Sequence, residues 1–147
     1  MRRLHDSAPA LLRLLLWVFG GALLLQGAVS AAVGLAGVQP PSWTSTLFTV
    51  GTLHGLIHTG LATALLALPA LDVSDRVRAA GAIAFGLTSL AMGGTFLLVD
   101  RPLGMPYDPS QNVAHFIDGS LAILLGLWIL LATRSRARVA PATARLG

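Results

Sequence analysis

Between Leu14 and Leu71 the chain contains no Asp, Glu, Lys or Arg, a run of 58 residues without a formal charge. Soluble domains carry about 25% charged residues, whereas only 11% of these 147 residues are charged. One helical crossing of a bilayer needs about 20 apolar residues, so a run of this length predicts more than one crossing. The sequence therefore predicts an integral membrane protein whose main surroundings are the lipid bilayer.

Four apolar stretches divide the chain, and each is long enough for a helix to cross about 30 Å of hydrocarbon. The stretches are continuous and lack the alternation of polar and apolar residues that is typical of transmembrane strands. The fold class predicted is an all-α, four-transmembrane-helix bundle built as two hairpins in a single domain. The predicted spans cover residues 10–37, 46–68, 77–99 and 112–133, and a basic cytoplasmic tail follows at 134–147.

The arginines predict the orientation of the bundle. Nine of the ten lie before or near the start of the first span, near the connection between the second and third spans, or after the fourth; the exception is Arg101. Because basic loops stay in the cytoplasm, both termini are predicted to be cytoplasmic, in a bacterial cytoplasmic (inner) membrane. A basic start before an apolar run is also typical of a secretory signal, but this run is longer than a signal core, which favours an uncleaved span. The basic tail suits lipid headgroups, and no nucleic-acid partner is predicted.

Polar side chains inside two of the spans are the candidate functional residues, because such groups are expensive in hydrocarbon and usually have a purpose. His54 and His58 are four residues apart and share one helix face. Asn112, His115 and Asp118 follow one another at intervals of three, and they also share a face. Since His54, His115 and Asp118 lie at similar depths, we expect the bundle to bring them together in the outer leaflet. His58 is expected about one turn deeper.

Several chemistries fit these residues. The side chains can hydrogen-bond across helices and hold the hairpins together, or relay protons. His54, His58, His115 and Asp118 can supply four ligands to a divalent metal ion, with Asn112 in support. Two facing histidines can instead be the axial ligands of haem b. The chain has no cysteine, which excludes thiolate sites, and it contains no catalytic constellation or phosphate-binding loop.

The fourth span carries the motif Asn112-x-x-His115-x-x-x-Gly119, and the second carries Gly51-x-x-His54 at a comparable place. In these motifs the chain resembles an actinobacterial four-helix integral membrane family of unknown function, whose members have an Asn-x-x-His-x-x-x-Gly pattern on the second and fourth helices. The resemblance covers roughly residues 47–131 and implies the four-helix fold without implying an activity.

The leading hypothesis is a small, non-enzymatic membrane protein that binds a ligand, a metal or a partner at the outer-leaflet histidine and aspartate residues. One alternative is a redox subunit that carries haem b. Another is a structural accessory subunit of a larger membrane complex, or a homo-oligomer, in which the polar residues only fix the packing of the helices.

Overall fold

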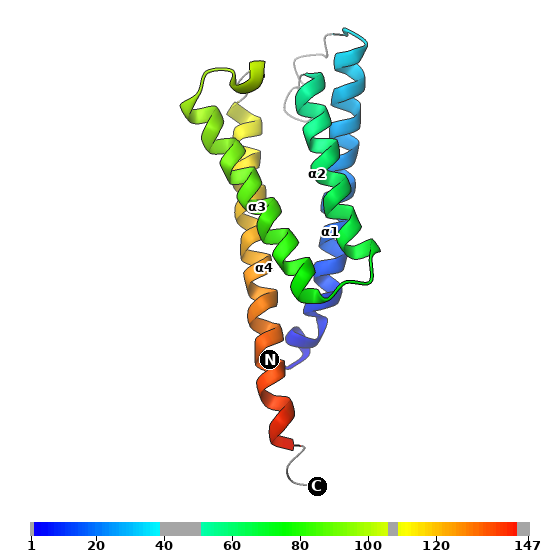
Figure 1. Ribbon diagram of the computed structural model, residues 1–147, viewed down its shortest axis with the longest axis vertical. Coiled ribbons are helices and arrows are strands. Elements are labelled where there is room, and N and C mark those ends of the chain that lie inside the picture. The colour runs from blue at the N-terminus through cyan, green and yellow to red at the C-terminus, as the bar shows by residue number, and fades with distance from the viewer. Residues whose placement is uncertain (1, 39–50, 106–108, 144–147) are drawn as a thin grey trace.

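The computed structural model describes residues 2–38, 51–105 and 109–143, and within these ranges the chain is helical throughout apart from short connections (Figure 1). The main helices are α1 (Arg2–Leu35), α2 (Thr52–Ala70), α3 (Asp75–Leu98) and α4 (Pro109–Thr143), and a short 3-10 turn, η2 (Pro102–Gly104), precedes α4. The predicted all-α four-helix fold is confirmed.

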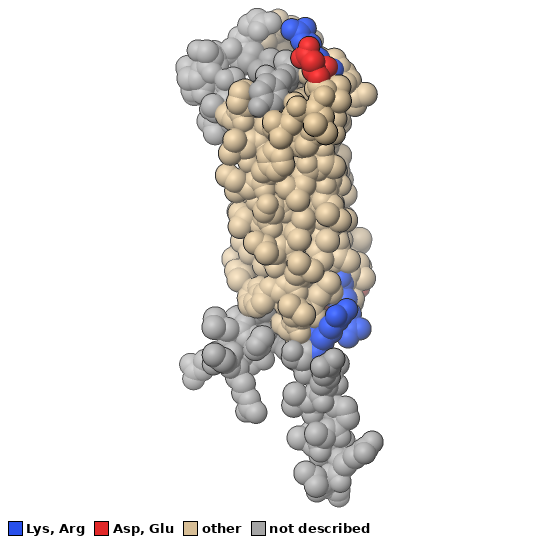
Figure 2. Space-filling view, turned by 90° about the vertical axis from the view of Figure 1, so that its left-hand side faces the viewer, with Lys and Arg blue, Asp and Glu red and all other residues tan. Residues whose placement is uncertain are grey.

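Each of the four main helices contains a segment that is long and apolar enough to cross a membrane. Large apolar side chains such as Leu25, Leu56, Leu97 and Leu124 are exposed on the outside of the bundle. A soluble monomer rarely exposes so much contiguous apolar surface, whereas lipid is a suitable surrounding for it. Figure 2 shows the same pattern on one face, where the charged side chains drawn in colour lie at the two ends and an uncharged belt separates them. The chain is a multi-pass membrane protein.

The helices are close to the predicted spans, but their bounds differ, most of all in α1, which extends from Arg2 to Leu35, and in α4. The first five residues of the predicted second span, 46–50, lie outside the described residues, and α2 is seen from Thr52. The fourth helix begins at Pro109 instead of residue 112, since proline is favoured in the first turn, where its missing N–H is not needed. It also continues to Thr143, so most of the predicted tail is helical.

Small residues allow the two helices of each hairpin to approach closely. A Cβ atom on Gly27 of α1 would lie 2.8 Å from the carbonyl oxygen of Gly55 of α2. In the second hairpin, a Cβ on Gly86 of α3 would lie 2.5 Å from the carbonyl oxygen of Gly119 of α4. Larger residues at these positions would force the backbones apart, so both hairpins use the small-residue contacts common in membrane helices.

The hairpins join mainly at the end of the bundle where α1 begins and α4 ends. The core there contains side chains from all four helices, namely Leu12, Leu16, Leu65, Ala79, Ala82, Phe85 and Ile129. Contacts between helices are much more numerous within each hairpin than between the two hairpins. In Figure 1 the α1–α2 and α3–α4 hairpins lie side by side, and their ribbons diverge toward the opposite end of the bundle.

A buried arginine lies at the same end as this core. Arg78 of α3 is only 2% exposed. It donates hydrogen bonds to the carbonyl oxygens of Leu68 (3.1 Å) and Leu71 (3.0 Å) at the end of α2, and to the carboxylate of Asp75 (2.9 Å). The last carbonyls of a helix have no partner within the helix, and a cation is favourable beside them. Arg78, Asp75 and these two carbonyls form what we call the arginine clamp, which ties α2 to α3.

Candidate metal centre

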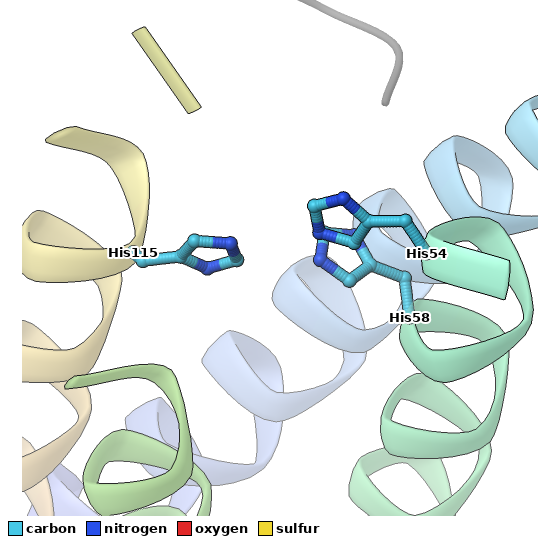
Figure 3. A group of neighbouring side chains, drawn as sticks. All are labelled: His54, His58 and His115. Atoms are coloured by element: carbon cyan, nitrogen blue, oxygen red, sulfur yellow. The ribbon is translucent and has the colours of Figure 1, made fainter. Parts of the chain in front are cut away.

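The histidines of α2 and α4 meet at the end of the bundle opposite the arginine clamp. Gly51, with φ of +142°, precedes α2 in a conformation that glycine adopts readily. The helix then places His54 and His58 one turn apart on the same face. His115 extends from α4 toward both of them, as Figure 3 shows. The imidazoles of the two hairpins therefore face each other and do not point into the lipid.

The three rings are packed closely. The ring centroids lie 4.6 Å apart for His54 and His58, 5.8 Å for His54 and His115, and 5.5 Å for His58 and His115. One ring nitrogen from each residue lies within 4.8 Å of the nitrogens of the other two. The side chains are 3%, 5% and 8% exposed, respectively. We call these three residues the histidine cluster.

The cluster contains polar atoms that have no hydrogen-bond partner. Among the described residues, His54 Nε2, His58 Nδ1 and His115 Nε2 are all buried and unpartnered. Leaving one such atom unsatisfied costs about 1–3 kcal/mol, and buried polar atoms are satisfied in most structures. Three imidazoles that meet in one buried place, each with an unpartnered nitrogen, indicate a bound group, and a cation is the group that a nitrogen lone pair attracts.

Phe96 of α3 forms part of the wall of the cluster, which the sequence did not indicate. Its ring stacks on His54 at 5.8 Å and on His115 at 6.4 Å between centroids, with interplanar angles of 22° and 8°. The residue is buried. A phenylalanine within an apolar span carries no distinguishing signal, so only the packing of α3 against α2 and α4 reveals its role in shielding the imidazoles from lipid.

Asp118 and Asn112 are outside the group of side chains whose nitrogen atoms converge. Asp118 is half-buried and lines a small cavity of about 40 Å³ together with His58 and His115. The buried side-chain oxygen of Asn112 has no partner and lies beside Gly93 of α3. The expected group of His54, His115 and Asp118 therefore differs from the group observed, in which His58 takes the place of Asp118.

The size of the site suits an ion. Zinc binds imidazole nitrogens at about 2.0–2.1 Å, and the three nitrogens, within 4.8 Å of one another, are near the spacing that ligands of one ion need. Haem b needs space for a porphyrin between two axial histidines. The cavity beside His58 and His115 measures about 40 Å³, which is room for little more than a water molecule. The three converging nitrogens suit a metal ion, and the adjoining cavity as it stands is too small for a porphyrin.

No protein-family model matches the chain, and no curated protein or solved structure shows significant similarity to it. What the site can do therefore follows from its own geometry. One imidazole nitrogen from each of three histidines, on two hairpins, meets the others in a buried position, and Asp118 lines the adjoining cavity.

Proposed function

We propose that this protein is a small metal-binding protein of a bacterial cytoplasmic membrane, with both termini in the cytoplasm. The start of α1 and the end of α4 lie at the same end of the bundle (Figure 1), and the arginine-rich segments belong to that end. The positive-inside rule assigns such an end to the cytoplasm. The histidine cluster then lies in the outer half of the bilayer.

The ion proposed is a divalent transition metal, with Zn²⁺ as the first candidate. The single observation that carries the proposal is the convergence of three buried imidazoles, each of which has a nitrogen without a hydrogen-bond partner. Imidazole suits zinc, copper and nickel, whereas magnesium and calcium prefer oxygen ligands. Neutral ligands leave the charge of the ion uncompensated, and the carboxyl group of Asp118 on the adjoining cavity supports the site by offering an opposite charge.

Metal binding at this site would hold the hairpins together where they otherwise touch little. His54 and His58 belong to the first hairpin and His115 to the second. The described contacts between hairpins are sparse compared with those inside them. A metal ion shared by α2 and α4 would thus stabilise the end of the bundle opposite the arginine clamp, because binding free energy adds to folding free energy.

The direct test is metal analysis of the purified full-length protein. We expect one equivalent of zinc after exposure to zinc and removal of loosely bound ions, and a His115→Ala variant should retain less than a tenth of that amount. The matched control is His5→Ala, which removes the only histidine outside the cluster. Loading with Co²⁺ should give visible absorption bands in the wild type and in the control but not in His115→Ala.

Other outcomes would contradict the proposal. Equal zinc content in His115→Ala and the wild type would place the metal elsewhere. A Soret band lost in His115→Ala would favour the haem-carrying redox subunit. No bound metal and no absorbance would favour a structural accessory subunit or a site for a partner or another copy of the chain. Membership of the family with the Asn-x-x-His-x-x-x-Gly pattern stays a prediction.

A further inference from the structure

The small cavity that adjoins the histidine cluster has a wall that is partly polar. Its volume is about 40 Å³, and all four main helices contribute to it. Its lining residues on α4 extend from Gln111 to Asp118, about one turn on either side of His115. His58 of α2 lines the cavity as well. The cavity therefore lies beside two of the three residues whose ring nitrogens converge.

Three histidines leave a zinc ion with one coordination position to fill. Structural zinc sites have four protein ligands, whereas catalytic zinc sites have three protein ligands and a water molecule. Within the described part of the chain, the potential ligands that converge are those of His54, His58 and His115, and the carboxylate of Asp118 is not among them. The fourth position at the cluster is therefore left for a molecule from outside the chain.

The adjoining cavity has the size and the polar groups that a water molecule needs. One water requires roughly 10–15 Å³, and the cavity of about 40 Å³ exceeds this. A buried water makes about three hydrogen bonds to protein groups. Besides the two histidines, the side chains in the wall that can form such bonds are those of Gln26, Ser89, Gln111 and Asp118. They come from α1, α3 and α4, so a water in the cavity can be bonded from several sides.

Asp118 is the only acidic residue among the described residues of the wall. It is three residues after His115, so both side chains lie on the same face of α4. A carboxylate accepts hydrogen bonds, and a water molecule bound to a cation donates them strongly. Carboxylates outside the ligand set commonly orient the groups around a metal ion in this way. Asp118 is therefore placed to act on the ion through a water molecule, without being a ligand itself.

We infer that the ion at the histidine cluster has a fourth coordination position that opens into this cavity, where a water molecule binds it and donates a hydrogen bond to Asp118. The inference rests on the proposed metal binding. Small molecules with a single donor atom, such as azide, replace the water at this position. The centre is then of the open kind found in catalytic zinc sites and not of the closed, purely structural kind.

Cobalt reports on the fourth ligand, because the visible bands of Co²⁺ change when one ligand replaces another. The full-length protein in detergent is loaded with one equivalent of Co²⁺, and sodium azide is titrated in. Azide is in equilibrium with its neutral acid, which can enter an apolar region. We expect a saturable change in the bands of the wild type. The cobalt content of the same samples is measured before and after the titration, so that ligand exchange is distinguished from loss of the ion.

Two pairs of variants test where the azide binds. Ser89→Leu fills the cavity and should abolish the saturable change while the cobalt content stays the same. Its control, Thr88→Leu, places the same side chain at the neighbouring exposed position, outside the cavity, and should behave as the wild type. Asp118→Asn removes the negative charge that an incoming anion meets, so the azide concentration for half-maximal change should fall by about threefold or more. Asp100→Asn removes an exposed charge outside the cavity and should leave that concentration unchanged.

Three outcomes would overturn the inference and leave the metal site intact. One equivalent of cobalt whose bands do not respond to azide would show a closed centre. Loss of cobalt from Asp118→Asn alone would show that Asp118 is itself the fourth ligand. A saturable change retained in Ser89→Leu would show that the exchanged ligand lies outside the cavity. If Ser89→Leu does not fold, Asp118→Asn and its control still decide. Absence of cobalt from the wild type would instead contradict the metal site itself.

Discussion

The arginine clamp and the histidine cluster are both buried polar groups that link elements of this bundle, yet they differ in how their polar atoms are satisfied. The guanidinium of Arg78 has three hydrogen bonds to Leu68, Leu71 and Asp75, at 2.9–3.1 Å. Each member of the cluster instead has a buried nitrogen without a partner. The guanidinium is satisfied by the protein and acts structurally, whereas the three converging imidazoles each keep a nitrogen that a bound ion can satisfy. The arginine clamp is therefore part of the structural framework, and the histidine cluster is the candidate binding site.

The largest effect is expected at the clamp. Arg78→Leu leaves two helix-end carbonyls and Asp75 without their donor, and we expect the free energy of unfolding to fall by about 3 kcal/mol, with or without zinc. Unfolding of the detergent-solubilised protein, followed by circular dichroism, measures this change. Arg76→Leu is the control, because Arg76 is exposed and adjacent. Equal losses in the two variants would mean that the clamp contributes nothing specific.

Zinc should stabilise the protein through the histidine cluster and not through the arginine clamp. At a concentration one hundred times its dissociation constant, zinc should raise the free energy of unfolding by about 2.7 kcal/mol. The increment should vanish in His115→Ala and persist in Arg78→Leu, since distant sites contribute additively. The same unfolding experiment with and without zinc measures it. If zinc still raised the free energy of unfolding of His115→Ala, its effect would not come from the histidine cluster, and the proposed difference between the cluster and the arginine clamp would be wrong.

In the metal-free protein, replacing a histidine of the cluster should not lower the free energy of unfolding, whereas replacing Arg78 should. His54→Phe keeps an aromatic ring beside Phe96 and His115 while removing an unsatisfied nitrogen. We expect the free energy of unfolding of the metal-free protein to stay the same or rise by about 1 kcal/mol. A fall of about 2 kcal/mol or more would indicate that the imidazole of His54 already makes a stabilising hydrogen bond in the metal-free protein.

The smallest loss of stability is expected from the outer partner of the clamp. Asp75 is 30% exposed, and Asp75→Asn keeps an oxygen that accepts from Arg78 while losing the charge. Partly exposed ion pairs contribute little, so we expect a loss below about 1 kcal/mol. Asp72→Asn serves as control, since Asp72 is exposed and outside the clamp. A loss as large as that of Arg78→Leu would show that the ion pair, and not the carbonyl contacts, holds the clamp.

The sequence by itself determined the membrane-spanning character, the four helices and the pairing of His54 with His58 on one face. These features follow from the charge-free run and from the 3.6-residue period of a helix, which relates positions within one helix. Helical spacing also placed His115 and Asp118 on a common face, although it could not say which of the two would meet the histidines of α2.

Only the tertiary structure decided that question, along with the stacking of Phe96 and the burial of Arg78. The rotation of each helix about its axis depends on which side chains fit together, here on close contacts such as Gly86 with Gly119. In a membrane the pattern of apolar residues gives little help, because lipid is as apolar as leucine and both faces of a helix can look alike. The sequence therefore identifies the candidate polar residues, whereas the packing of the helices determines which of them form the site.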